Sequence, residues 1–251
     1  MRAQNIAAAS NGLDFKIETD GEDAVFRAED DPAFPHTYKH IPVRAPFAGA
    51  FNAYNIMAAL IAVSSLTGKP FEELSRLVPS LSAIKGRMTA IDAGQPFEVI
   101  VDYAHTPSSF ETIFPPVKKR CAGKMIALFG SGGERDLTKR PLQGQIAAKF
   151  CDTIILTDED PRGEDSVALL QMIADGAKKE GKKADEDLFI IPDRKKAIRQ
   201  AFKSAHKGDI VLLLGKSHEN SIIYKDYTMP YDEISEAKTA LSEMGFTQNE
   251  M

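Results

Sequence analysis

The chain has 251 residues, of which 43% are apolar and 27% are charged, and its formal net charge at pH 7 is −5. This length fits one large domain or two smaller ones. The acidic balance argues against a general nucleic-acid binder, which needs a basic face, but it leaves room for a local basic pocket that holds an anionic ligand.

Cysteine content and apolar runs narrow the class of protein further. The two cysteines, Cys121 and Cys151, are too few for a disulfide framework or a zinc site, so we expect both to be buried thiols. No apolar run approaches the roughly 18 residues of a membrane span, and the N-terminus lacks the apolar core of a secretory signal. We expect a cytoplasmic monomer that binds neither membranes nor nucleic acid.

The N-terminal part of the chain is less regular than the remainder. Two short alternating runs, Leu13–Glu18 and Ala24–Ala28, are separated by turn-forming residues and predict a hairpin. Residues Asp30–His40 predict a polar connection. A helix rich in small and apolar residues begins near Asn52, and we expect it to be buried on most sides. A second, short helix is predicted at Phe71–Val78.

Beyond Arg87 the sequence alternates regularly between two kinds of segment. Short apolar runs suited to buried parallel strands occur at Val99–Asp102, Met125–Phe129, Thr153–Thr157, Leu188–Ile191 and Ile210–Leu214. Helical stretches between and after them are Ser108–Lys119, Lys139–Phe150, Val167–Lys179, Lys195–Ala205 and Tyr231–Met244. This alternation predicts an α/β fold with a doubly wound, mostly parallel sheet. We place the domain boundary between residues 85 and 86.

Polar clusters directly follow four of the predicted strands, at the sheet edge where parallel-sheet proteins bind ligands. They are Asp102–Pro107, Gly130–Arg140, Thr157–Asp165 and Gly215–Glu219. The glycine-rich turn Gly130–Arg140 fits neither common nucleotide fingerprint, because it contains no G-x-G-x-x-G and no Gly-Lys-Ser/Thr follows. Four such clusters together favour a binding site.

The first two clusters each allow a functional and a structural explanation. Asp102 and His105 could hold a ribose hydroxyl, a metal-bound phosphate or a reacting proton. Equally, Asp102 could cap the next helix while His105 packs locally. Arg135 could bind a carboxylate or phosphate through two parallel hydrogen bonds. Alternatively, it could pair with Asp136 on a solvated turn.

The other two clusters suit an amino-acid ligand. The acids around Arg162 could bind a ligand that carries both amino and carboxylate groups, or they could be helix-capping acids in an exposed loop. Gly215 would permit close backbone approach, and Glu219 could accept a hydrogen bond from an ammonium group.

Six stretches in this order resemble the Mur ligases, and within them the MurE type. They are Phe51-Asn52-Ala53-Tyr54-Asn55, Gly86-Arg87-Met88, Val101–Pro107, Phe129–Arg140, Asp160-Pro161-Arg162 and Gly215–Glu219. The resemblance extends from about Phe47 to the C-terminus. It implies an ATP-dependent ligase of peptidoglycan synthesis that adds a diamino acid, meso-diaminopimelate or L-lysine, to UDP-N-acetylmuramoyl-L-Ala-D-Glu through an acyl phosphate.

The resemblance assigns five residues to the nucleotide. Asn52 and Asn55 would lie near the adenine of ATP. Arg87 and Asp102 would contact ATP phosphate or ribose, and His105 would support that contact.

Five further residues are assigned by the resemblance to the incoming amino acid. Arg135 and Arg162 would clamp its carboxylate, with Asp160 beside them. Gly215 and Glu219 would hold its distal polar end. No residue of this chain is assigned as catalytic or as a metal ligand.

The chain departs from the family pattern where phosphate chemistry is concerned. The family's central ATPase domain has a phosphate loop and a carbamylated lysine that helps hold magnesium, and we find neither here. Gly215-Lys216-Ser217 has the tail of a phosphate-loop motif, but Ile210 occupies its first glycine position. The resemblance then implies that residues 1–85 are the end of the central domain and residues 86–251 the C-terminal amino-acid-binding domain, without the UDP-binding domain. ATP and Mg²⁺ would be held mainly by the missing part, so we expect the chain alone to be inactive.

Two sequence differences bear on the amino acid. Asp160 stands where ligases that use meso-diaminopimelate usually show asparagine, and Ser217 replaces the second glycine of Gly-Lys-Gly-His-Glu. Arg162 favours a distal carboxylate, as in diaminopimelate, whereas the Asp160 carboxylate favours a bare ammonium, as in lysine or ornithine. The sequence leaves this choice open.

Two other functions are compatible with the sequence. A folylpolyglutamate synthetase-like ligase shares the architecture and reaction type, but the acids Asp158–Asp165 with Glu219 speak against glutamate, which lacks a second ammonium. A non-catalytic module that binds an amino acid, or docks a subunit carrying the ATPase part, would explain the absent phosphate loop.

Overall fold

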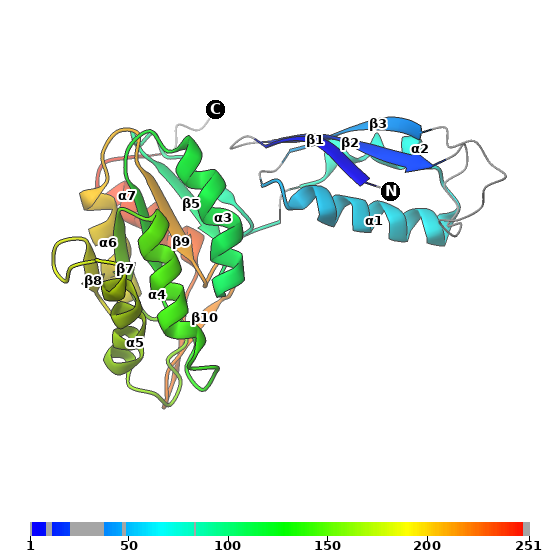
Figure 1. Cartoon of the computed structure of the whole chain (residues 1–251). Helices are drawn as coiled ribbons and strands as arrows, with labels where there is room; N and C mark the ends of the chain where they lie inside the picture. Colours follow the sequence, from blue (N-terminus) through cyan, green and yellow to red (C-terminus); the bar gives the residue numbers. More distant parts are fainter. Residues whose placement is uncertain (1, 9–11, 21–37, 47–48, 83, 248–251) are drawn as a thin grey trace. The chain divides into compact units, whose positions relative to one another are not determined.

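The computed structural model describes residues 2–8, 12–20, 38–46, 49–82 and 84–247. The chain divides into two compact units, Met1–Ile84 and Lys85–Met251 (Figure 1). The identification of these units with two domains of a ligase stays a prediction.

The first unit combines an antiparallel sheet with two short helical segments and one long helix. Its sheet has the order β1-β2-β3, with bounds Arg2–Ala8, Leu13–Asp20 and Tyr38–Ala45. The helices are α1 (Asn52–Thr67), α2 (Phe71–Ser75) and the 3₁₀ helix η1 (Val78–Ser80). Alternation along β2 and β3 sends every second side chain to the core, namely Leu13, Phe15, Ile17, Ile41, Val43 and Ala45. These side chains pack against the helices.

The strand predicted at residues 13–18 is confirmed as β2, and its described partners are β1 and β3. Leu13 lies opposite Ala45, and Ile17 lies opposite Ile41, in the pairing of β2 with β3. The predicted hairpin partner, Ala24–Ala28, lies outside the described residues. The connection predicted to extend to His40 was wrong at its end, since residues 38–40 belong to β3. The strand was missed because it contains a proline, which an edge strand tolerates.

Helix α1 begins at Asn52, as predicted, but the expectation that it is buried on most sides was wrong. Its buried residues follow a spacing of three or four and lie on one face: Asn52, Ala53, Ile56, Met57 and Leu60. Tyr54 is 62% exposed and Leu66 is 87% exposed. The core of this unit covers only one side of α1, so the apolar composition did not translate into burial all round.

The second unit contains a six-stranded sheet with the order β4-β5-β9-β6-β7-β8. The strands are β4 (Thr89–Ile91), β5 (Glu98–Asp102), β6 (Met125–Phe129), β7 (Thr153–Leu156), β8 (Leu188–Ile190) and β9 (Ile210–Leu214). All neighbouring pairs are parallel except β4 with β5. The predicted α/β class with a mostly parallel sheet is confirmed.

Helices cover both faces of this sheet (Figure 1). They are α3 (Pro107–Arg120), α4 (Lys139–Phe150), α5 (Ser166–Lys179), α6 (Arg194–Ser204) and α7 (Glu233–Glu243). On the α3 face, the rings of Phe110 and Phe129 lie 4.8 Å apart. On the other face, Phe202 of α6 and Leu241 of α7 pack against alternate residues of the buried strands. Among the described residues, no helix is both long and apolar enough to cross a membrane.

The order of the strands in the sheet places all four polar clusters at the same edge of the sheet. β9 returns to lie between β5 and β6, so the strands β5, β9, β6 and β7 are adjacent and parallel. Each of the four clusters follows one of these strands, and the carboxyl ends of parallel strands meet at the same sheet edge. A small antiparallel pair that was not predicted, β10 (Ser221–Ile223) with β11 (Thr228–Pro230), follows the last cluster.

Candidate functional site

The glycine-rich turn after β6 packs directly against the loop after β7. The amide of Gly133 donates to the carbonyl oxygen of Asp160 at 2.7 Å. A Cβ atom on Gly133 would lie 1.9 Å from the carbonyl oxygen of Pro161, so only glycine fits there. Gly133 therefore allows the two loops to pack closely. This role explains why the turn contains glycine although it matches no phosphate-binding fingerprint.

A buried arginine fastens the same two segments together. Arg140 of α4 has no exposed side-chain surface, and it donates to both oxygens of Glu164 at 2.7 and 2.9 Å. Its guanidinium also donates to the carbonyl oxygen of Gly132 at 3.3 Å. Glu164 in turn accepts from the amide of Glu134. These bonds hold the turn after β6 in a fixed relation to the loop after β7.

The two arginines predicted to bind a carboxylate project from these interlocked segments and lack acidic partners. Arg135 is exposed and forms no ion pair with any described residue. The alternative pairing with Asp136 is not seen, because that carboxylate accepts instead from the amide and hydroxyl of Thr138 at 2.9 and 2.7 Å. Arg162 is half-buried, and its Nε is buried without a partner among the described residues. Two uncompensated guanidinium groups at one sheet edge suit an anionic ligand.

The backbone of Arg162 is fixed in an uncommon conformation. Its φ of 54° lies in the left-handed region, and its amide donates to the carbonyl oxygen of Ile223 at 3.0 Å. It also forms an isolated bridge with Tyr224. The β10–β11 pair therefore holds the backbone of Arg162 through Ile223 and the adjacent Tyr224.

A lysine joins the two acids that were predicted at the amino-acid end. The side chain of Lys216 is only 1% exposed, and its Nζ donates to Asp160 Oδ1 at 2.8 Å and to Glu219 Oε2 at 2.5 Å. Asp160 Oδ1 also accepts from the amide of Ile223 at 2.9 Å. The charge of Asp160 is thus partly compensated within the protein, by an ammonium that it shares with Glu219. Lys216 is likewise committed to these acids and is not free to bind a phosphate.

The cluster after β5 surrounds a tyrosine. The hydroxyl of Tyr103 donates to Glu219 Oε1 at 3.1 Å. Its ring centroid lies 4.7 Å from those of His105 and His218, and the Arg87 guanidinium carbon lies 4.9 Å from it. His105 Nδ1 contacts the carbonyl oxygen of Tyr103 at 2.7 Å. Arg87 and His105, both predicted at the nucleotide, therefore gather around one ring whose hydroxyl contacts Glu219, which is predicted at the amino acid.

Asp102 supports the loops of this cluster through its carboxylate. Oδ2 accepts from the amide of Met88 at 2.8 Å, and Oδ1 accepts from the amide of Ala104 at 2.9 Å. Burial raises the pKa of Asp102, and the two backbone hydrogen bonds oppose that rise. The alternative in which Asp102 caps α3 was wrong, since Thr106 and Ser109 form the capping box.

Gly215 is close to a buried acid. A Cβ atom at Gly215 would lie 2.1 Å from Oε1 of Glu159, and its φ of +94° already favours glycine. Glu159 Oε1 accepts from the amide of Gly130 at 3.1 Å, and burial raises the pKa of its carboxyl group. The space that Gly215 leaves open is therefore filled by Glu159 from the neighbouring loop.

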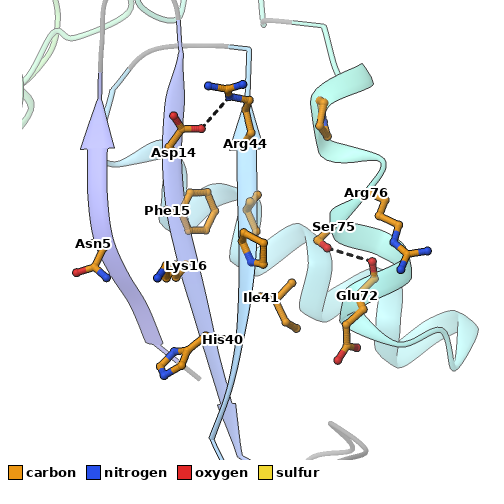
Figure 2. Close-up of a pocket in the computed structure, with 13 residues that line it drawn as sticks. Asn5, Asp14, Phe15, Lys16, His40, Ile41, Arg44, Glu72, Ser75 and Arg76 are labelled. Carbon is orange, nitrogen blue, oxygen red and sulfur yellow. Dashed lines mark hydrogen bonds and ion pairs between the residues drawn. The ribbon is translucent and has the colours of Figure 1, made fainter.

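The predicted adenine residues lie in the first unit. Asn52 and Asn55 are one turn apart on α1, and Asn55 Nδ2 donates to Asn52 Oδ1 at 3.0 Å. The same unit has an open hollow of about 710 Å³ between β2, β3 and α2 (Figure 2). Asp14 and Arg44 in this hollow neutralise each other through an ion pair at 3.0 Å. The hollow contains none of the predicted site residues.

Family comparison decides which protein class this geometry belongs to. A family model described as "Mur ligase, glutamate ligase domain" matches residues 86–217, which is more than half of the chain. The chain belongs to the Mur ligase family. The resemblance on which the residue assignments were based is thereby confirmed.

Among its Mur ligase relatives are proteins named UDP-N-acetylmuramyl-tripeptide synthetase. That of Treponema denticola is 59% identical over 77% of this chain and 37% of its own length. That of Roseiflexus sp. is 46% identical over 98% of this chain and 45% of its own length. A UDP-N-acetylmuramoyl-L-alanyl-D-glutamate–2,6-diaminopimelate ligase of Solibacter usitatus is 34% identical over all of this chain and 46% of its own. The chain thus spans less than half the length of these relatives.

Solved Mur ligase structures share the fold. A structure of a UDP-N-acetylmuramoyl-L-alanyl-D-glutamate–2,6-diaminopimelate ligase matches 98% of this chain and 46% of its own, with a TM-score of 0.61 and 28% identity. A folylpolyglutamate synthase from Mycobacterium tuberculosis matches 86% of this chain and 44% of its own, with a TM-score of 0.59 and 15% identity. The second likeness shows the fold alone.

Magnesium, which the Mur ligase resemblance implies, finds no set of ligands in the part of the chain that the structure describes. No three His, Cys, Asp or Glu side chains there are grouped so that they could hold a metal ion. The site residues do not fit the ion by themselves, so no chemical step at this site is assigned to magnesium.

Three residues that organise the site were not singled out from the sequence. They are Tyr103, which contacts Glu219, Lys216, which contacts Asp160 and Glu219, and Arg140, which contacts Glu164. All three lie inside the stretches that resemble the family, but the sequence does not show which residues they contact. Only the folded chain shows that a lysine from one strand end neutralises an acid from another.

Proposed function

We propose that this chain is the amino-acid-binding part of an ATP-dependent ligase that adds a diamino acid to UDP-N-acetylmuramoyl-L-Ala-D-Glu in peptidoglycan synthesis. The names of its relatives support the reaction class. The observation that carries the proposal is the pair of uncompensated arginines, Arg135 and Arg162, on two loops that interlock at the ligand-binding edge of a parallel sheet.

In this proposal the chain's own residues hold the incoming amino acid in position. Arg135 and Arg162 bind its carboxylate through charge-assisted hydrogen bonds, with Asp160 beside them. Gly215 and Glu219 meet its distal polar end. Positioning of this kind lowers the barrier by presenting the amino group to the activated carboxyl group of the acceptor. That carboxyl group would be activated as an acyl phosphate formed with ATP.

The nucleotide assignments form a second part of the proposal. Arg87 forms no ion pair with a described residue of its unit, although its charge acts on the buried Asp102, so its guanidinium can still donate to a phosphate. Asp102 holds the backbone next to Arg87 and would meet the ribose or phosphate from there, with His105 in support. Asn52 and Asn55 keep the role near the adenine that the resemblance implies. ATP and Mg²⁺ are proposed as partners of the whole ligase, and the cytoplasm as its location.

The proposal extends to the parts of the chain. Residues 1–85 would be the end of a central ATPase domain, and residues 86–251 the C-terminal domain. The choice of amino acid depends on the net charge of the residues around the ligand, and this charge differs from a simple count of the acidic side chains. Because Lys216 partly compensates Asp160, this carboxylate favours lysine or ornithine over diaminopimelate less than a free carboxylate would.

Isothermal titration calorimetry on the 251-residue chain tests the proposal. The titrants are meso-diaminopimelate, L-lysine, L-ornithine and L-glutamate, each without nucleotide. We expect at least one diamino acid to bind and glutamate to bind more weakly than that diamino acid. Binding of glutamate alone would instead favour a folylpolyglutamate synthetase-like substrate. Binding of none of the four would refute an amino-acid site in this chain.

A further inference from the structure

Tyr103 contacts the proposed distal-end residue Glu219 but has no part in the function proposed above. Its hydroxyl donates to Glu219 Oε1 at 3.1 Å, while Lys216 Nζ donates to Glu219 Oε2 at 2.5 Å. Burial and the Glu219 carboxylate raise the pKa of Tyr103, so the hydroxyl keeps its proton at neutral pH and acts as a donor. The carboxylate is thus held at both oxygens by side chains from two different loops.

The ring of Tyr103 is itself held in place. His105 and His218 lie against it with centroid separations of 4.7 Å, at interplanar angles of 59° and 53°. The guanidinium carbon of Arg87 lies 4.9 Å from its centroid. A ring packed by three side chains has little freedom to rotate, so its hydroxyl is aimed at Glu219.

The second holder, Lys216, is equally constrained. It is buried, and its other bond is to Asp160 Oδ1, which also accepts from the amide of Ile223. Because the Lys216 ammonium is shared between two acids, Glu219 retains part of its negative charge. A carboxylate offers about four acceptor positions, and these contacts use two of them. Glu219 is 33% exposed, so a ligand can reach the others.

We propose that Tyr103 is a positioning residue that fixes the Glu219 carboxylate so that its remaining acceptor positions face the distal ammonium of the bound amino acid. This inference rests on the proposed function, because it takes Glu219 as the residue that meets the distal end. It goes further by making recognition of that end depend on a residue that touches no ligand.

The test compares two amino acids that differ at the far end of the side chain. L-Lysine carries a distal ammonium, and L-norleucine has the same α-amino and carboxylate groups with an uncharged end. The chain and its Tyr103→Phe variant are titrated with each. Tyr103→Phe keeps the ring and removes only the hydroxyl. We expect the Kd for lysine to rise roughly tenfold to a hundredfold, as for loss of one hydrogen bond to a charged group, and the Kd for norleucine to stay unchanged.

A matched control is Tyr227→Phe. Tyr227 is 59% exposed and stacks on Tyr224, and it makes no side-chain hydrogen bond to any other described residue. This variant should bind both amino acids like the unaltered chain. Thermal denaturation of each variant checks that the fold is retained.

The outcomes separate the inference from the proposed function. An unchanged Kd for lysine in Tyr103→Phe, or an equal loss for both amino acids, overturns the inference and leaves the amino-acid site standing. Equal affinity of the unaltered chain for lysine and norleucine overturns the inference as well, since Glu219 then does not recognise the distal ammonium. If the unaltered chain binds neither these two nor diaminopimelate, the proposed function fails and the inference falls with it.

Discussion

Arg140 and Glu164 form a two-bond ion pair in which the arginine is fully buried and the acid is 30% exposed. The pair joins the start of α4 to the loop after β7. The two proposed carboxylate-binding arginines lie on the segments that this pair fastens. Its integrity therefore determines both the stability of the second unit and the geometry of the candidate site.

Replacing Arg140 with methionine should destabilise the protein by about 2–4 kcal/mol, because removal of one partner leaves Glu164 and the Gly132 carbonyl without their donor. Urea denaturation followed by circular dichroism measures the change in the free energy of unfolding. Arg120→Met is the matched control, since Arg120 also binds both oxygens of Glu98 but is 33% exposed. Its loss should cost less than about 1 kcal/mol. Equal effects of the two variants would contradict a special role for Arg140.

The same pair predicts a defined pH dependence. Hydrogen bonds from Arg140 and the Glu134 amide hold the pKa of Glu164 at about 2, against an ordinary value of 4.5. A lowered pKa stabilises the fold above pH 4.5, and this contribution is lost as the pH falls towards about 2. The stability difference between the unaltered chain and Arg140→Met should therefore shrink on acidification from neutral pH to about pH 3. A difference that stays constant over this range would show that Glu164 is not the titrating group.

For the carboxylate clamp, Arg135→Ala and Arg162→Ala should each weaken diamino-acid binding by about 1.5–3 kcal/mol, the range for hydrogen bonds to charged groups. Calorimetric titration gives the two Kd values directly. Arg120→Ala provides the charge-matched control, because Arg120 pairs with Glu98 at the opposite end of β5 from the site. Unchanged affinity in both site variants would refute the clamp.

Gly215→Ala tests the fit between two neighbouring loops. The new Cβ would collide with Glu159, and φ at this position is +94°. Gly181→Ala is an internal reference, because Gly181 has a φ of +93° and a Cβ added there would meet nothing within 4 Å. The left-handed backbone alone costs about 1–2 kcal/mol, so Gly181→Ala should lose that amount and Gly215→Ala distinctly more. Similar melting temperatures for the two variants would show that Glu159 moves aside freely.

Much of the second unit could be predicted because its central strands, β5, β6, β7 and β9, are almost entirely buried. Runs such as Met125–Phe129 and Ile210–Leu214 are apolar on both faces, and the structure reproduces their bounds. The clustering of the strand ends followed from the parallel topology alone. The three-residue strands β10 and β11 could not be found, because they lack the apolar run that revealed the equally short β8.

The chemistry of individual site residues was harder to predict than their location. Lys216 and Asp160 are 56 residues apart, and nothing local to either shows that they pair. The sequence therefore predicted a free charge on Asp160, whereas the structure compensates that charge in part through Lys216. For helix α1 the predicted burial was too high, since composition alone does not say how many sides of a helix are covered by the core.

The close fit of Gly133 against Pro161 bears on the kinetics of the proposed amino-acid binding. The backbone that carries both arginines is already ordered by contacts within the protein, so an amino acid bound as we propose would have few loops to order. Preorganisation of this kind removes part of the entropic cost of association. Amino acids that differ in affinity for this surface will therefore differ mainly in how fast they leave it.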